Sequence, residues 1–276
     1  MCIRDSLYAN HMNQMNIPIF IRMLAINETS EQQYLTILNK SMTIPSQYPQ
    51  ISGSEATVDW FIQQNKAKHE QIEILAYSTI VLHQSPMLIP QYAYHFIYDV
   101  NTSKPLTIQF TASTEPFVEN PNGSIQKQLP FTGHIRGGFD KSELYYHLNL
   151  QMLQNDTIGR VTFGDNKADV FIGGYDPTRE QSVLLKGNFG VNYSLKIRHS
   201  KPYAVLMMAR GGSYKGAFYH QQEIIKVPKS GTLTPFKQAA LVTRIYPDSS
   251  EMSQLQWIPP AGSSLPIELY FIPLNE

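Results

Sequence analysis

Hydrophobic and polar residues alternate along most of this chain with a period of two. From Leu106 to Phe110, every second residue is apolar and the residues between them are Thr or Gln. The same spacing recurs in residues 92–100, which are rich in Tyr, and in residues 193–197. Alternate side chains of an extended strand point to opposite faces, so this pattern predicts β-strands with one face in a core and one in water.

Strands are also predicted over nine other segments. They are residues 17–26, 34–38, 73–82, 159–163, 203–209, 222–227, 239–245, 254–258 and 267–272. Clusters of Asn, Pro, Gly and Ser, typical of turns, separate many of them. Many short strands with turns between them favour antiparallel β-sandwiches over a parallel sheet with crossover helices. The chain is therefore predicted to be all-β.

One segment departs from the period of two. Residues Ser52 and Glu55 have the spacing of a capping box, in which a hydroxyl and a carboxylate satisfy amides at the start of a helix. Val58, Phe61 and Ile62 follow at helical spacing. We predict one short amphipathic helix at about residues 54–67.

The domain organisation follows from a stretch without apolar periodicity. Residues 114–124 contain turn formers and acidic residues, and we predict that they link two tandem β-sandwich domains. The N-terminal domain, with the helix, would span residues 17–113, and the C-terminal domain residues 125–276, both ordinary sizes for a sandwich. Residues 1–16 are predicted to be an unstructured leader. Its beginning, Met1–Ser6, looks like adapter-derived read-through in an assembled reading frame.

Charge and cysteine content narrow the classes of function. The 276 residues include 22 Lys and Arg and 22 Asp and Glu, so the formal net charge is zero. Without a positive field, nucleic-acid partners are not expected. The longest apolar runs are too short to cross a bilayer as a helix, so no membrane span is expected in this piece. Cys2 is the single cysteine, which excludes an internal disulfide and a C-x-x-C centre.

Oxygen-bearing side chains gather between residues 163 and 176. They are Asp165, Asn166, Asp169 and Asp176. Oxygen-rich loops of this kind can hold calcium, although the spacing does not match an EF-hand. Asp and Asn also begin turns without any metal. Calcium is thus the one cofactor that the sequence suggests, with turn formation as the alternative.

Two Arg-Gly-Gly units occur among the predicted strands. The pairs Arg136-Gly137 and Arg210-Gly211 could form backbone anion nests with an arginine beside them. Glycine at such places also permits a bulge or a sharp strand bend where a side chain would clash. The sequence alone leaves both interpretations open.

Asparagine sequons are numerous, and tryptophan is rare. Six Asn-x-Ser/Thr sequons start at Asn27, Asn39, Asn101, Asn122, Asn155 and Asn192. They would mark exposed loops in a eukaryotic secreted protein, and only turn-rich composition in a bacterial one, which we favour. The two tryptophans, Trp60 and Trp257, are predicted to lie in the core. No G-x-S-x-G, Walker A or H-E-x-x-H motif is present, so no catalytic residue is predicted.

Gly- and Pro-rich motifs at residues 185–193, 209–218 and 259–266 resemble a known group of proteins. The chain is similar, over most of residues 17–274, to the C-terminal region of secreted surface proteins of spore-forming Gram-positive bacteria. In those proteins, such regions accompany a small stalk domain named after the N-terminus of copper amine oxidase. The resemblance implies an extracellular or cell-envelope location. It implies no oxidase activity, because the named domain is absent.

Three functions are consistent with these features. The first is a non-catalytic, extracellular pair of β-sandwiches for adhesion or for binding a cell-wall polymer, a polysaccharide or a surface protein. The second is a carbohydrate-active hydrolase or an accessory domain of one, whose two carboxylates would face each other across a groove. The third is a self-assembling surface or appendage subunit that pairs through edge strands.

Overall fold

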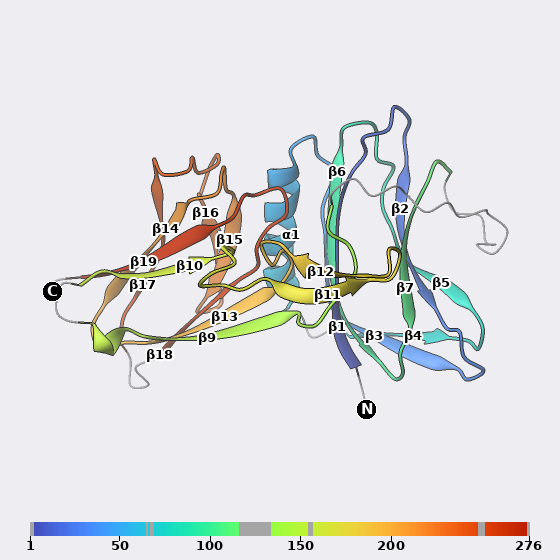
Figure 1. The fold of residues 1–276 in the computed structure, drawn as a ribbon, viewed down its shortest axis with the longest axis horizontal. Coiled ribbons are helices and arrows are strands. Elements are labelled where there is room, and N and C mark those ends of the chain that lie inside the picture. Colours follow the sequence, from blue (N-terminus) through green and yellow to red (C-terminus); the bar gives the residue numbers. More distant parts are fainter. Residues whose placement is uncertain are drawn as a thin grey trace. The chain divides into compact units, whose positions relative to one another are not determined.

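The computed structural model describes residues 3–64, 66, 69–115, 134–153, 157–247 and 252–274. The chain divides into two compact units, unit 1 (Met1–Pro130) and unit 2 (Phe131–Glu276). Each unit consists of stacked β-sheets, which confirms the all-β, sandwich-like prediction (Figure 1). Residues 116–124 of the predicted linker lie outside the described residues. No helix in the described ranges is long and apolar enough to cross a membrane.

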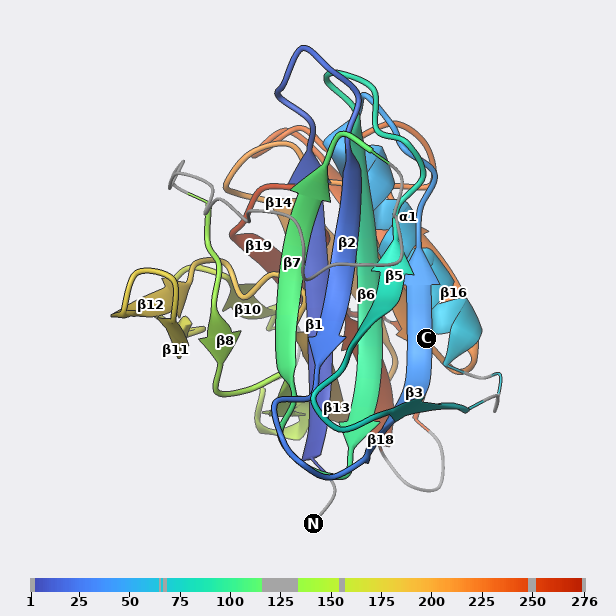
Figure 2. The same ribbon diagram turned by 90° about the vertical axis from the view of Figure 1, so that its right-hand side faces the viewer.

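Unit 1 is a two-sheet sandwich with one helix. Its elements are β1 (Ile3–Met12), β2 (Phe20–Ile26), β3 (Gln33–Met42), α1 (Pro49–Gln63), β4 (Glu70–Ile74), β5 (Thr79–Gln84), β6 (Ala93–Thr102) and β7 (Thr107–Ser113). One sheet has the order β1-β6-β3-β4 and the other β5-β2-β7, with antiparallel neighbours throughout. In Figure 2 the smaller sheet lies in front of the larger, and α1 lies behind.

Strand β6 is buried on both faces, and not on one as its alternation predicted. Tyr94, Phe96 and Tyr98 point into the core between the two sheets. The opposite face, which carries His95 and Asp99, is also buried, and α1 packs against β6 and β3. The polar residues at alternate positions of β6 therefore face helix α1 and not solvent.

Helix α1 begins earlier than predicted. It starts with Pro49 at its first turn, after Tyr48, which makes no side-chain cap hydrogen bond. Proline suits this position because its fixed φ is helical and its missing N–H is not needed there. The predicted capping box at Ser52 was wrong, because this residue lies inside the helix and its Oγ is 2.9 Å from Thr43 Oγ1.

The packed face of α1 is made mostly of small residues. It contains Ser52, Gly53, Ala56 and Thr57, together with Trp60 and Phe61. Ile62, which the sequence placed on the apolar face, is 40% exposed. Small side chains let a helix lie close to a sheet, and they carry too little hydrophobicity to be recognised from periodicity alone.

The N-terminal segment is a strand, which corrects the prediction of an unstructured leader over residues 1–16. Strand β1 pairs with β6 in an unbroken register from Ile3 opposite Thr102 to Met12 opposite Ala93. Of the β1 side chains that the structure describes, Leu7 and Ala9 contribute to the apolar core. Because polar residues such as Asp5, Ser6 and Asn10 interrupt both faces, the strand has too weak an apolar alternation to be recognised in the sequence.

The single strand predicted over residues 73–82 is two strands in different sheets. Strand β4 belongs to the larger sheet and β5 to the smaller one. The turn between them contains Tyr77 with a φ of 51°. The break was missed because this turn contains neither Gly nor Pro, the usual turn signals.

The described residues of unit 2 form three sheets. Its elements are β8 (Gly138–Phe139), β9 (Glu143–Asn149), a 3₁₀ turn (Leu150–Met152), β10 (Gly159–Phe163), β11 (Ile172–Asp176), β12 (Gln181–Leu185), β13 (Asn192–Arg198), β14 (Tyr203–Ala209), β15 (Gly216–His220), β16 (Glu223–Val227), β17 (Ala239–Ile245), β18 (Met252–Trp257) and β19 (Ile267–Pro273). The sheets have the orders β16-β15-β18-β13-β9, β10-β19-β14-β17 and β12-β11-β8. The β9–β13 pair is parallel, a departure from the antiparallel prediction.

The core of unit 2 lies between the five-stranded and the four-stranded sheets. Trp257 is fully buried, as predicted, and stacks on Phe218, its neighbour across the β15–β18 pair. Because adjacent residues of a strand point to opposite faces, Tyr219 and Gln256 lie on the outer face of the five-stranded sheet. This outer face carries the candidate site described below.

Candidate functional site

Two of the four predicted calcium ligands close the loop that contains them. The Oδ1 atom of Asp165 accepts hydrogen bonds from the backbone N–H groups of Lys167 at 2.9 Å and Ala168 at 3.0 Å. The Oδ1 atom of Asn166 accepts one from Phe171 N at 3.1 Å. Both side chains thus do what Asp and Asn do in turns without a metal.

Asp169 is fully buried in a separate network of hydroxyl and backbone donors. Its Oδ1 accepts from the Tyr146 hydroxyl at 2.6 Å, and its Oδ2 accepts from the Tyr193 hydroxyl at 2.6 Å and Gly164 N at 2.7 Å. Burial, with the adjacent carboxylate, raises the pKa of both tyrosines far above their ordinary value. Asp169 therefore ties β9 and β13 to the loop after β10.

Asp176 lies apart, at the end of β11, and is held by cations. Its Oδ2 accepts from Arg179 Nε at 2.6 Å and Arg136 Nε at 3.2 Å, and its Oδ1 accepts from Thr178. Burial alone would raise the pKa of Asp176. The hydrogen bonds from Thr178 and the two arginines outweigh burial and hold this pKa well below its usual range.

The structure does not bring the four predicted calcium ligands together. Where the chain is described, no group of three or more His, Cys, Asp or Glu side chains is arranged to hold a metal ion. The carboxylates of Asp169 and Asp176 are each taken up by hydrogen bonds within unit 2. Calcium binding stays a prediction of the sequence, and a melting temperature that does not change in excess EDTA would contradict it.

The first Arg-Gly-Gly unit positions an arginine beside a buried carboxylate. Arg136 forms the ion pair with Asp176 described above. Gly137 has a φ of +139°, and a Cβ atom there would lie 2.5 Å from Tyr175 O. Glycine is required because the chain crosses close to β11 at this point.

The second Arg-Gly-Gly motif, at Arg210, also places an arginine beside a buried carboxylate. The anion nest predicted there is filled by a carbonyl oxygen of the protein. The N–H groups of Arg210 and Gly211 both donate to Pro266 O at 3.0 Å. Arg210 Nε lies 3.2 Å from Glu268 Oε2, a carboxylate with 7% side-chain exposure. A Cβ atom on Gly211 would lie 1.8 Å from Leu265 O. At this motif the glycine permits a sharp bend and does not form an anion nest, because the two N–H groups bind a carbonyl oxygen of the protein.

An open depression of about 310 Å³ lies on unit 2 where β15 and β18 meet the β15–β16 turn. Its lining contains a phenol, an imidazole, a hydroxyl, a thioether and four amides. These belong to Tyr219, His220, Gln221, Gln222, Met252, Ser253, Gln254 and Gln256. None of these side chains is a carboxylate, an ammonium or a guanidinium. Such a surface can exchange hydrogen bonds in both directions with a neutral polar ligand.

The turn that borders the depression has an unusual backbone. Gln221 and Gln222 have φ values of 49° and 65°, and they join His220 to its partner Glu223 in a two-residue hairpin. This conformation ordinarily uses Asn-Gly or Asp-Gly, because other residues are strained there. Strained backbone concentrates at functional sites, so an observed outlier of this kind supports a functional hypothesis.

His220 provides a further polar group beneath the depression. Its Nδ1 lies 2.8 Å from Gln254 O, and its side chain is 4% exposed. Its Nε2 is closed to solvent and has no hydrogen-bond partner among the described residues. Gln254 Nε2 donates to Ser194 Oγ at 3.1 Å, which fixes one amide of the lining.

This depression was not predicted from the sequence. Its signals were present, since Gln254 and Gln256 have the period of an outward face and Gln221-Gln222 stands where a hairpin needs a turn former. Glutamine is common on exposed strand faces, however, and nothing in the sequence showed that these residues meet.

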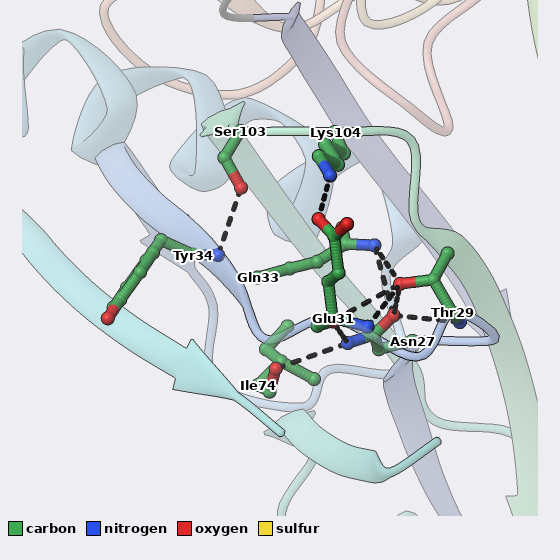
Figure 3. Close-up of polar contacts among 8 residues, drawn as sticks. All are labelled: Asn27, Thr29, Glu31, Gln33, Tyr34, Ile74, Ser103 and Lys104. Atoms are coloured by element: carbon green, nitrogen blue, oxygen red, sulfur yellow. Dashed lines mark hydrogen bonds and ion pairs between the residues drawn. The ribbon is translucent and has the colours of Figure 1, made fainter. Parts of the chain in front are cut away.

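The first sequon shows that an asparagine can be structural in this chain. The Asn27 side chain donates to Glu31 O at 2.7 Å and Ile74 O at 3.3 Å, and it accepts from Thr29 and from Gln33 Nε2 (Figure 3). It also donates to Leu75 O at 3.0 Å. It is 1% exposed. Asn27 therefore organises the β2–β3 loop from inside, as the turn interpretation predicts. Asn122 and Asn155 lie outside the described residues.

Comparisons with known proteins give little beyond this geometry. No protein-family model matches the chain, and no curated protein matches it. Among solved structures, the chain is similar to the crystal structure of PBSX exported protein XepA, with 7% identity, a TM-score of 0.20, and coverage of 98% of this chain and 86% of that one. A likeness this weak carries neither fold nor function to this chain. The resemblance to secreted Gram-positive surface proteins stays a prediction.

Proposed function

We propose that this protein is a non-catalytic binding module of the extracellular space or cell envelope that holds a neutral polysaccharide in the depression of unit 2. The observation that carries the proposal is the combination of a neutral lining with the strained Gln221-Gln222 turn at its border. Amide groups donate and accept hydrogen bonds, as the hydroxyl groups of a sugar require. Tyr219 adds an aromatic ring whose apolar face can pack on a sugar ring.

The chemistry of the lining favours binding over hydrolysis. A glycosidase needs two carboxyl groups that flank the bond to be cleaved. The lining offers amides and an imidazole instead, and His220 is held by the backbone carbonyl of Gln254. The ligand would be a glycan strand without charge, since no cationic or anionic side chain is present in the lining to pair with one.

Binding of the full chain to an array of neutral polysaccharides tests the proposal. We expect retention that is weakened roughly tenfold by Tyr219→Ala or Gln256→Ala, the equivalent of about 1.4 kcal/mol. Tyr175→Ala is the matched control, because this tyrosine is half-exposed on β11 and does not line the depression.

Three outcomes would contradict the proposal. They are absence of retention on every glycan, equal loss of binding with the Tyr175 control, and release of reducing ends from the bound glycan, which would indicate a hydrolase. Retention by protein or peptide ligands alone would assign the depression to a different partner.

A further inference from the structure

Polar side chains form a buried layer between α1 and the larger sheet of unit 1. Asn39 and Ser41 lie on β3, His95 lies on β6 and Trp60 lies on α1, and each is at most 9% exposed. Ser41 stands opposite Ile97 in the β3–β6 register, on the side away from the core between the sheets. These four residues therefore occupy the side of the sheet that α1 covers.

Contacts between the elements hold these residues in one layer. Asn39 Nδ2 donates to Trp60 O at 3.2 Å, which joins β3 to α1. Thr43 N donates to His95 O at 3.1 Å, which joins β3 to β6 beside the imidazole. Thr43 Oγ1 in turn lies 2.9 Å from Ser52 Oγ of α1. The helix thus approaches the sheet through polar groups at both ends of this layer.

Several atoms of the layer have no partner within the protein. They are Asn39 Oδ1, Ser41 Oγ, Trp60 Nε1, and both Nδ1 and Nε2 of His95. Each is closed to solvent and forms no hydrogen bond with any described residue. Buried polar atoms in native proteins are bonded to protein or to ordered water in the large majority of cases. Five such atoms on one interface need bonding partners that are not protein groups.

The chemistry of the five atoms indicates what kind of molecule these partners are. Trp60 Nε1 can only donate and Asn39 Oδ1 can only accept, whereas a serine hydroxyl and a neutral imidazole do both. Burial, with the positive charge of His11 as a smaller cause, lowers the pKa of His95 to about 3, so its ring is neutral. A cation could not accept from the indole, and an anion could not donate to the amide oxygen. Water does both.

We propose that the interface between α1 and the larger sheet is a buried hydration site, in which ordered water molecules bridge Trp60 Nε1, His95, Ser41 Oγ and Asn39 Oδ1. The waters complete the hydrogen bonding of the layer. They also explain how a helix face of small and polar residues is held against a polar sheet face.

Nuclear magnetic resonance of the ¹⁵N-labelled full chain tests the proposal, because the protein has only two indole N–H groups. We expect the Trp60 indole proton to show a cross-peak with long-lived water. The Trp257 indole is the internal control, since its Nε1 donates to Tyr214 OH at 2.8 Å in the core of unit 2. The indole N–H signal that disappears in the Trp60→Phe variant belongs to Trp60, and the remaining one to Trp257.

A crystal structure that resolves water provides the second measurement. We expect density within hydrogen-bonding distance of His95 Nδ1 or Nε2 and of Trp60 Nε1. A Trp60 indole without a water cross-peak, an interface without density, or an ordered molecule other than water at these atoms would each overturn the proposal.

Discussion

Single residues of this chain carry large structural effects where they are buried and satisfied by several bonds. Asn27 is such a residue, because its amide links the β2–β3 loop to the backbone at Ile74 (Figure 3) and at Leu75. By contrast, Thr107 is exposed and makes one side-chain bond, to Glu28. The number of buried groups that lose their partner decides the cost of a substitution.

Asn27→Ala is expected to destabilise unit 1 by about 2–3 kcal/mol, because it leaves buried carbonyl and amide groups without partners. The measurement is urea unfolding followed through Trp60, which lies in unit 1. Thr107→Ala is the control and should stay within about 0.5 kcal/mol of the parent protein. Equal effects of the two substitutions would show that the Asn27 network contributes no stability.

Gly211→Ala is expected to destabilise unit 2 by at least about 3 kcal/mol, since no small movement can relieve a Cβ atom that close to the backbone at Leu265. Gly138→Ala, in the other Arg-Gly-Gly unit, is the matched control, because a Cβ atom there would meet nothing within 4 Å. It should change the unfolding free energy by less than about 0.5 kcal/mol. A tolerated Gly211→Ala would contradict the close approach seen at this bend.

At the scale of elements, the sequence predictions missed β1, β8, β9, β11, β12 and β15, and they misplaced the start and the packed face of α1. Of its described side chains, strand β1 supplies Leu7 and Ala9 to the core, and it covers one edge of β6 along ten paired positions. Helix α1 packs with a face of small residues on β3 and β6, on the side of the larger sheet away from the core between the sheets. Both elements are stabilised by where they pack and not by their own periodicity.

Removal of residues 1–6 is expected to lower the stability of unit 1 by about 1 kcal/mol, because the first four pairs of β1 with β6 are lost while Leu7 and Ala9 stay in the core. Removal of residues 1–12 should unfold unit 1 or cause it to aggregate, since the full edge of β6 becomes unpaired. Circular dichroism and light scattering measure both. An unstructured leader would predict no change in either truncation.

At the scale of the whole molecule, the two units differ in how acid acts on them. His83 of β5 lies in the core of unit 1, with Nε2 3.0 Å from Tyr94 OH and Nδ1 3.0 Å from Tyr98 OH. Burial, with the charge of Lys40 as a smaller cause, lowers the pKa of His83 to about 4. Burial lowers the pKa of His95 further, to about 3. In unit 2 the pKa of Asp176 is held well below its usual range.

Unit 1 is therefore expected to lose stability before unit 2 as the pH falls from 7 to 4.5. Below pH 6.5 the unfolded chain binds protons at both histidines and the folded chain does not, so unfolding is favoured, by on the order of 2 kcal/mol for each imidazole. Asp176 is ionised in both states over this range and loses its contribution only at lower pH.

Urea unfolding midpoints at pH 7 and 4.5 measure the two units separately when each variant keeps one tryptophan. The fluorescence of Trp60 in the Trp257→Phe variant reports on unit 1, and that of Trp257 in the Trp60→Phe variant reports on unit 2. The unit 1 midpoint should fall and the unit 2 midpoint should stay nearly constant. Equal falls in both units would show that the buried histidines are not the cause.

The sequence by itself determined the class of fold and most of the strands. Strands β10, β14 and β17 have the predicted bounds, because apolar side chains that alternate with a period of two fit a strand and not a helix. The burial of Trp60 and Trp257 followed from their size and apolar surface. These features depend on local pattern, which the sequence contains in full.

Only the tertiary structure decided which residues meet. Asp165 and Asp176 share a segment in the sequence but serve different loops, and Gln222 and Gln256 are distant in sequence but line one depression. Strand register and sheet order set these neighbours, and both depend on packing over the whole unit. For the same reason, β1 and the polar layer beneath α1 became visible only in the folded chain.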